Sequence, residues 1–330
     1  MSRVSIIIPV YNPDRSVIRC LKSVYKQTIS DYEVIVLDDG STDESFMLVE
    51  KYLNNHPEYS KKTRVIRKKN SGVADTRNYG MSLATGNYLA FIDQDDFVAK
   101  TYLEKYISFA DSGKYDVICG GYERIAKNGC ILKRVIPRDT EWGRYVVTAP
   151  WAHLYKREFL IKNNVHFLDN SIGEDVYLNV VLNTTTDKFK CINNADYKWF
   201  FNESSVSNSK QNTLNDDVDV IKLLDSIYSD SNDSVYLQYF FLRYVCWYLL
   251  FSSRGSNKRD IDEAYGKCFR WIKEHYPDYR KNKYIGFRMP KGEDGGTHLF
   301  VLLFYFAEKL RLLKPFLKLF GKKKLENDII

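Results

Sequence analysis

Short apolar runs alternate with segments of helical periodicity in the first half of the chain, and this alternation limits the possible folds more than any other feature. Residues 4–10 (VSIIIPV) form a nearly continuous apolar run, which is typical of a parallel strand covered on both faces. Residues 17–24 follow with apolar side chains at helical spacing. The same signals predict strands at 33–37, 63–67 and 88–92 and helices at 43–55 and 74–84. Alternation of this kind predicts an α/β fold with a parallel, doubly wound sheet.

Acidic side chains follow two of these expected strands directly. An acidic segment, residues 93–96 (DQDD), comes after the fourth strand, and Asp38 and Asp39 follow the second. Ligands of open α/β sheets bind beyond the carboxyl ends of the strands, so we expect both acidic groups to line one pocket with residues 9–11. Three carboxylates within this segment are costly to bury without a compensating charge. A hard divalent cation that also contacts phosphate oxygens supplies that charge. The sequence therefore predicts a cation and phosphate site.

The pattern changes in the second part of the chain. From about residue 215, long helical patterns rich in Leu, Tyr and Phe replace the strand signals. We place a domain boundary in 209–215 and divide the chain into an α/β domain, residues 1–212, and a helical domain, residues 213–330.

Composition narrows the classes of partner and site. The net charge of +7 favours anionic partners. The six cysteines are scattered without a C-x-x-C motif, so we expect neither disulfides nor a zinc site. We expect no signal peptide before the first strand, because no apolar stretch with a cleavage site precedes it. No apolar run approaches the ~20 residues that span a bilayer. We expect a cytoplasmic protein, with the inner face of the cell membrane as a further location.

Four segments carry a resemblance to a known family. They are VSIIIPVYN at 4–12, VLDDGSTD at 36–43, NSGVADTRN at 70–78 and FIDQDD at 91–96. Their order and spacing resemble those of the family 2 glycosyltransferases with the GT-A fold, over roughly residues 1–210. The resemblance implies a Rossmann-like, mainly parallel sheet flanked by helices. It also implies a nucleotide-sugar donor and a saccharide or lipid-linked saccharide acceptor, with no nucleic-acid partner.

The resemblance implies a donor site beyond the strand ends. Asp39 resembles the carboxylate that accepts a hydrogen bond from the uracil ring, which suits an ionised Asp because it only accepts. Tyr11 resembles the stacking residue, and Arg77 a cation that contacts the nucleotide. From the residues alone, Tyr11 capping the core and Arg77 on the surface of an amphipathic helix remain alternatives. The implied donor residues are Pro9, Val10, Tyr11, Asp39, Ser71, Gly72, Arg77, Asp93 and Gln94.

The same resemblance implies a metal ligand and a base. Asp95 matches the position that binds Mn2+ or Mg2+, which bridges the donor phosphates. Glu174 and Asp175 match a downstream Glu-Asp motif, and we assign the general base to Asp175. Without the family, this pair is interpreted as acidic charge at a helix N-terminus. A single base with a metal-held leaving group implies one displacement and inversion.

Two further segments bear on the acceptor and the metal. Trp151 and His153 lie in residues 150–155 (PWAHLY), which match a family segment near the acceptor end of the cleft. Many relatives carry a further metal-binding His after the Glu-Asp helix. Residues 197–206, where it is expected, contain none.

The segment that begins at Lys309 and ends at Lys324 combines basic and apolar side chains. On a helical wheel, the Leu and Phe side chains share one half and the basic side chains fall opposite. This pattern indicates a helix that lies in an anionic membrane interface. A helix packed on its own domain, with a solvated basic face, explains the pattern equally well. Pro315 favours a kinked or divided helix.

Together these features predict an inverting, metal-dependent, non-processive glycosyltransferase that uses a nucleotide sugar, with a UDP-sugar favoured, in surface or capsular polysaccharide synthesis. A nucleotidyltransferase would need a Gly-rich basic loop after the first strand, and residues 12–14 (NPD) are neither. A catalytically silent sugar-nucleotide-binding partner in a polysaccharide assembly complex is the alternative outside the enzymes, and the missing His leaves it open.

Overall fold

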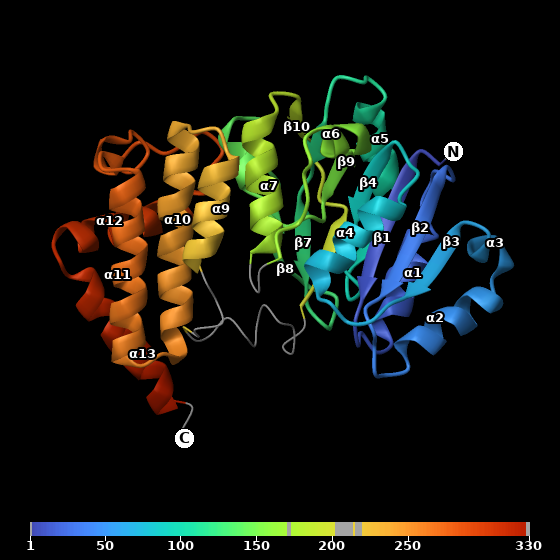
Figure 1. Cartoon of the computed structure of the whole chain (residues 1–330), viewed down its shortest axis with the longest axis horizontal. Coiled ribbons are helices and arrows are strands. Elements are labelled where there is room, and N and C mark those ends of the chain that lie inside the picture. The colour runs from blue at the N-terminus through green and yellow to red at the C-terminus, as the bar shows by residue number, and fades with distance from the viewer. Residues whose placement is uncertain (1, 170–172, 202–213, 215–219, 328–330) are drawn as a thin grey trace. The chain divides into compact units, whose positions relative to one another are not determined.

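The computed structural model describes residues 2–169, 173–201, 214 and 220–327. The chain forms two compact units, Met1–Phe201 and Asn202–Ile330 (Figure 1). The predicted boundary between residues 212 and 213 lies outside the described residues and stays a prediction.

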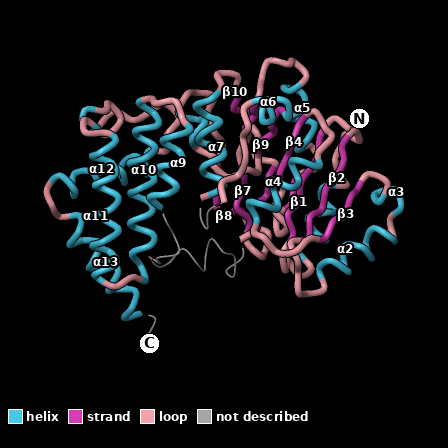
Figure 2. The backbone as a smooth tube through the Cα atoms, in the orientation of Figure 1, coloured by secondary structure: helices cyan, strands magenta, loops and turns pink. Residues whose placement is uncertain are grey.

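A seven-stranded sheet forms the centre of the first unit, in the order β10-β6-β9-β4-β1-β2-β3. Strands β1 to β4 pair in parallel, and so do β6 and β10, whereas β9 runs antiparallel to both of its neighbours. The sheet is therefore mainly parallel, as the sequence predicts (Figure 2). Its strands are β1 (Val4–Val10), β2 (Tyr32–Asp38), β3 (Thr63–Arg67), β4 (Tyr88–Phe91), β6 (Val117–Cys119), β9 (His153–Lys156) and β10 (Phe189–Cys191).

Strand β1 lies in the middle of this core. All seven of its residues are buried, because β2 and β4 flank it and helices cover the sheet. A β-carbon on Gly80 would lie 2.5 Å from Ile7 Cγ2, so this glycine lets α4 approach β1 closely. The helices of this unit are α1 (Ser16–Val24), α2 (Ser45–Asn54), α3 (Pro57–Ser60), α4 (Val73–Leu83), α5 (Tyr102–Ala110), α6 (Arg157–Lys162) and α7 (Glu174–Thr185), with a 3-10 turn, η1 (Trp142–Tyr145).

A second, four-stranded sheet belongs to the same unit. It has the order β5-β11-β7-β8, with β5 (Phe97–Val98), β7 (Tyr122–Ile125), β8 (Ile131–Val135) and β11 (Tyr197–Phe200). Strand β5 follows the acidic segment at once, and Val98 is paired with Tyr197 of β11. This pairing fixes the end of the acidic segment against a strand that lies 99 positions later in the chain.

The second unit is helical, as predicted. Its helices are α9 (Val220–Asp230), α10 (Val235–Ser252), α11 (Lys258–His275), α12 (Gly295–Lys309) and α13 (Leu313–Asn327), with 3-10 turns η2 (Ser253–Gly255) and η3 (Tyr279–Lys281). Across the described part of the chain, no helix combines the length and apolar character that crossing a membrane requires.

The predicted helix over 309–324 is divided differently from the expectation. Helix α12 ends at Lys309, Arg311 has a positive φ of 63°, and α13 begins at Leu313. Pro315 therefore lies in the first turn of α13 and not in a helix interior. Backbone N–H groups of the first turn have no intrahelical acceptor, so proline is tolerated there and does not kink the helix.

Candidate active site

The carboxyl ends of β1 and β4 are joined by one side chain. The Gln94 amide oxygen accepts a hydrogen bond from the backbone N–H of Tyr11 over 2.6 Å, and its NH2 group donates to the Tyr11 carbonyl over 3.1 Å. Pro9 and Val10 are buried within β1, whereas Tyr11 is 47% exposed. Of these three predicted residues, Tyr11 is therefore the one whose ring is open to a ligand.

The Asp39 carboxylate is held at the N-terminus of α4. It is 4% exposed and accepts hydrogen bonds from the backbone N–H groups of Ser71 and Gly72, both over 2.9 Å. Gly72 has a φ of 92°, which favours glycine and turns the chain into α4. The structure thus brings three predicted donor residues together. Because a carboxylate accepts about four hydrogen bonds, Asp39 keeps acceptor capacity for a further N–H.

Lys68 completes this group, and the sequence reasoning missed it. Its ammonium lies 2.6 Å from Asp39 Oδ1 and 3.1 Å from Asp75 Oδ2, and its side chain is 15% exposed. These carboxylates raise the pKa of Lys68 in spite of its burial. The available signal was the basic run 67–69 at the carboxyl end of β3, because β3 is the parallel neighbour of β2, which ends at Asp38.

Arg77 of α4 connects the acidic segment with the start of α7. One terminal nitrogen lies 2.8 Å from Asp93 Oδ1 and the other 3.0 Å from Glu174 Oε1. Its side chain is 5% exposed, which excludes the surface alternative. Burial lowers the pKa of Arg77, but the charges of Asp93 and Glu174 outweigh it and raise the pKa above its usual value. The planar, two-pronged guanidinium suits this position, because it can bond both carboxylates at once.

Crowded carboxylates make the acidic segment suited to a cation. Burial and the charge of Asp93 raise the pKa of Asp95 to about 6, and a divalent cation beside it would remove this penalty. Within the described residues, no group of three or more His, Cys, Asp or Glu side chains is placed to hold a metal ion. Asp95 therefore fits a cation that takes most of its ligands from phosphates and water, as Mg2+ commonly does. Residues 202–206, part of the stretch that lacks the family His, lie outside the described residues.

Asp96 has a different role from Asp95. It is 1% exposed and accepts hydrogen bonds from the Tyr197 hydroxyl over 2.6 Å and the Phe200 N–H over 2.8 Å. The Tyr197 hydroxyl also accepts a hydrogen bond from the Asp93 N–H over 3.2 Å. Asp96 and Tyr197 therefore anchor the acidic segment to β11, whereas Asp93 and Asp95 stay partly exposed.

The pair Glu174 and Asp175 begins α7, after Gly173 with a φ of 86°. Glu174 points to Arg77, and Asp175 accepts a hydrogen bond from the N–H of Val176 over 2.8 Å. Burial and the neighbouring Glu174 charge raise the pKa of Asp175 to about 7. A carboxylate with a pKa near the working pH is suited to take a proton during a reaction.

Trp151 and His153, the predicted acceptor residues, are both buried. The Trp151 ring is 8% exposed and stacks on Tyr197, with ring centroids 4.5 Å apart and planes at 7°. His153 is fully buried in β9, between β4 and β6, and this burial lowers its pKa to about 4. An acceptor cannot reach His153 in this structure, so we do not keep it as an acceptor residue. Trp151 supports the tyrosine that anchors Asp96.

Known proteins resemble this chain in sequence and in fold. The profile of glycosyl transferase family 2 matches residues 5–169. YibD of Escherichia coli K12, an uncharacterized glycosyltransferase, is 28% identical over 222 residues, which are 62% of this chain and 63% of YibD. The chain thus spans less than two thirds of the length of that relative.

Two solved GT-A structures resemble the chain in fold. S. aureus TarS 1-349 in complex with UDP gives a TM-score of 0.57 at 18% identity, over 88% of this chain and 95% of that chain. The mannosyltransferase PcManGT from Pyrobaculum calidifontis, in complex with GDP-Man and Mn2+, gives 0.55 at 14% identity, over 98% and 87%. The fold is therefore GT-A. The family profile covers 165 of the 330 residues, and the chain belongs to glycosyl transferase family 2.

Proposed function

We propose that this protein is an inverting, metal-dependent, non-processive glycosyltransferase that uses a nucleotide sugar, with a UDP-sugar as the favoured donor. The observation that carries the proposal is the position of Arg77, which forms an ion pair with Asp93 and another with Glu174. It joins the segment suited to a cation and diphosphate to the helix that carries the proposed base. The complexes of TarS with UDP and of PcManGT with GDP-Man and Mn2+ support a nucleotide-sugar donor.

The nucleotide binds beyond β1 and β2 in this proposal. The exposed Tyr11 ring offers a stacking face, and the Asp39 carboxylate accepts a hydrogen bond from the N–H of the base. After Ser71 and Gly72, which bond Asp39, the chain enters α4. Because Gly72 has no side chain, the ribose can approach the backbone closely there. Arg77 holds Asp93 in place, and in this proposal Asp93 contacts the sugar side of the nucleotide.

Asp95 holds the divalent cation, Mn2+ or Mg2+. When bound, the cation neutralises the diphosphate that leaves with the nucleotide. The protein's own contribution is to keep Asp95 in place, since burial and the Asp93 charge oppose its ionisation until a cation binds. Asp96 accepts hydrogen bonds from Tyr197 and Phe200 and thereby anchors the segment that carries Asp95.

Asp175 acts as the general base. It accepts the proton of the acceptor hydroxyl as that oxygen bonds to the anomeric carbon and the bond from this carbon to the diphosphate oxygen breaks. One displacement inverts the anomeric configuration. Glu174 is held by Arg77 and acts as a positioning residue, because its charge helps to raise the pKa of Asp175 towards neutrality.

An exposed apolar face on the helical unit supports a membrane-linked acceptor. Leu313 and Leu317 of α13 are buried, whereas Leu312, Phe316 and Leu319 are 58%, 48% and 68% exposed. We propose that this outward face contacts the inner surface of the cell membrane, where lipid-linked saccharides of a surface or capsular polysaccharide are extended.

Two of the basic residues that the helical wheel places on a free cationic face, Lys314 and Lys318, are paired with a carboxylate. Lys314 and Lys318 lie 3.0 and 2.7 Å from the carboxylate of Asp262 in α11. Helix α13 thus packs on its own unit and also exposes apolar side chains. It therefore has features of both alternatives, the helix packed on its own domain and the helix in a membrane interface. Membrane contact therefore rests on the apolar face.

A donor screen tests the proposed activity. Purified protein is incubated with UDP-, GDP- and TDP-sugars, with and without Mn2+ and a saccharide acceptor, and nucleotide release is measured. We expect metal-dependent release that increases with acceptor. Tight UDP-sugar binding with neither transfer nor hydrolysis would instead indicate the silent binding partner.

A further inference from the structure

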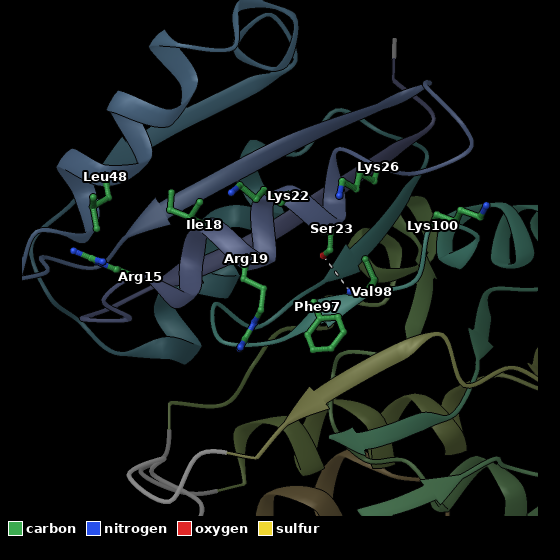
Figure 3. A pocket seen from close by; sticks show the side chains of 10 residues that line it. All are labelled: Arg15, Ile18, Arg19, Lys22, Ser23, Lys26, Leu48, Phe97, Val98 and Lys100. Atoms are coloured by element: carbon green, nitrogen blue, oxygen red, sulfur yellow. Dashed lines mark hydrogen bonds between the residues drawn. The ribbon is translucent and has the colours of Figure 1, made fainter. Parts of the chain in front are cut away.

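A basic pocket lies along α1, and none of its lining residues belongs to the donor or base groups described above. It has a volume of about 700 Å3. Five of its lining side chains are cationic, namely Arg15, Arg19, Lys22, Lys26 and Lys100. Figure 3 shows four of them along α1 and its flanking residues, with Leu48 on α2 and Phe97 on β5 beside them. The spacing of four, three and four residues along the chain places Arg15, Arg19, Lys22 and Lys26 on one side of the helix.

Four of these cations are not neutralised within the described part of the protein. Arg15, Lys22, Lys26 and Lys100 are exposed and make no ion pair with a described carboxylate. Like charges three or four residues apart on a helix repel one another, so the arrangement opposes folding. A ligand of opposite charge explains why such a row lines a concave surface.

Arg19 forms the inner wall of the pocket and links it to the acidic segment. Its guanidinium lies over the Phe200 ring, 3.7 Å from the centroid, and over the Phe97 ring at 5.5 Å. It also donates a hydrogen bond to the backbone carbonyl oxygen of Asp95. Unlike the four exposed cations, Arg19 is partly buried, so the pocket has a fixed charge at its base.

We propose that this pocket binds an extended anion that carries several phosphate groups. Arg15 and Lys26 are eleven residues apart, and at ~1.5 Å per residue the row extends over roughly 16 Å, which exceeds one phosphate group. Guanidinium and ammonium groups both bind phosphate oxygens. The apolar wall of Ile18, Leu48, Phe97 and Val98 contacts the carbon groups between the phosphates. The concave shape and the inset Arg19 favour a discrete polyanion over a flat membrane surface.

Calorimetry with linear tripolyphosphate as the probe tests this site, with the full chain in metal-free buffer that contains saturating UDP. The test variant is the double substitution Lys22→Glu and Lys26→Glu. The control is Lys114→Glu and Lys162→Glu, which makes the same change of charge at two exposed lysines elsewhere on the unit. We expect the pocket variant to bind tripolyphosphate about tenfold or more weaker than the parent, because two cations within a Debye length of the ligand become anions. The control should stay within about twofold of the parent.

Three outcomes would overturn the proposal. The first is that the parent does not bind tripolyphosphate, and the second is that both double variants lose the same amount of tripolyphosphate affinity. The third is that the pocket variant binds tripolyphosphate like the parent but binds vesicles of equal phosphatidylglycerol and phosphatidylcholine more weakly. The last would assign the row to a membrane surface. Nucleotide release in the donor screen does not depend on Lys22 or Lys26, so failure of this site is distinguishable from failure of the proposed function.

Discussion

The guanidinium of Arg77 donates a hydrogen bond to Glu174 over 3.0 Å, across 97 positions of the sequence. The second terminal nitrogen of Arg77 holds Asp93 over 2.8 Å. One buried cation is thus shared by the donor side and the base side of the proposed site. A change at Arg77 should therefore affect stability and transfer together.

We expect Arg77→Gln to lower both the unfolding temperature and the rate of sugar transfer. Removing one partner of a buried ion pair typically costs about 3–5 kcal/mol, because the remaining charges stay buried without compensation. Arg77→Lys keeps the charge but not the two-pronged geometry, so it should retain more stability than Gln and still lose transfer. Thermal unfolding and nucleotide-release assays measure the two effects.

The matched control for Arg77 is Arg64→Gln. Arg64 pairs with Glu33 over 2.9 Å at a partly exposed position, where such a pair contributes about 0–1 kcal/mol. Equal unfolding temperatures for the Arg77→Gln and Arg64→Gln variants would show that the Arg77 pairs do not stabilise the fold.

Asp175→Asn should separate binding from transfer. The amide is nearly isosteric but cannot accept the proton, so we expect UDP-sugar affinity within about twofold and a transfer rate lower by about 10²–10⁴-fold. Calorimetry and acceptor-dependent product formation provide the measurements. Asp187→Asn, an exposed change in the same unit, is the control. Normal turnover by the Asp175 variant would mean that another group is the base.

The pH dependence of transfer should report Asp175. Its pKa of about 7 means that the carboxylate loses its proton as pH rises through neutrality. The rate should therefore rise across this range and level off above it. The residual rate of Asp175→Asn should lack this rise. A parent profile that is flat between pH 6 and pH 8, on roughly either side of this pKa, would contradict the assignment.

The raised pKa of Asp175 also affects stability, which should fall with rising pH whereas the transfer rate should rise. Because the folded pKa of Asp175 lies above the ordinary value of 3.8, the folded state binds the proton more tightly than the unfolded state. The stabilising contribution is complete below pH 4 and is lost as pH rises through about 7. Urea unfolding at several pH values should show a smaller decline for Asp175→Asn than for the parent.

Asp95→Ala should abolish metal-dependent UDP binding. Asp95 is partly exposed, and, unlike Asp93, it is not paired with Arg77. The donor phosphates alone hold the cation weakly without it. Titration of UDP with and without Mn2+ measures the difference. If Mn2+ strengthens UDP binding equally in the parent and the variant, the metal ligand lies elsewhere.

The outward face of α13 can be tested without shortening the chain. Because Leu317 is fully buried, a truncation after Pro315 would damage the fold as well as the surface. We expect Leu312→Gln, Phe316→Gln and Leu319→Gln together to reduce sedimentation with vesicles. The control, Met47→Gln with Ile161→Gln, changes similarly exposed apolar side chains (60% and 61%) of the other unit. Equal sedimentation of both variants would contradict membrane contact through α13.

Local patterns predicted much of the first unit. The apolar run of β1 and the helical spacing of Val17, Cys20, Leu21 and Val24 both depend on neighbouring residues, and both are confirmed. Strands β5, β7 and β11 were not predicted. They are two to four residues long and are defined by pairing between distant segments, which leaves little signal in the sequence.

The difference between local patterns and contacts of distant segments also explains which site residues could be predicted. The acidic segment follows a strong strand signal, so its place at the sheet edge could be predicted. Tyr197 and Lys68 were missed because their contacts with Asp96 and Asp39 exist only after distant strands pair. For His153, the family match gave a position along the chain but not the antiparallel strand between β4 and β6 that buries it.

The two hydrogen bonds between Gln94 and the backbone of Tyr11 have a consequence for donor selection. They tie the backbone of Tyr11, whose ring we propose to stack on the nucleobase, to the segment that we propose to hold the cation. For a donor seated as proposed, we therefore expect the protein to discriminate between ligands by the distance between their base and their phosphates.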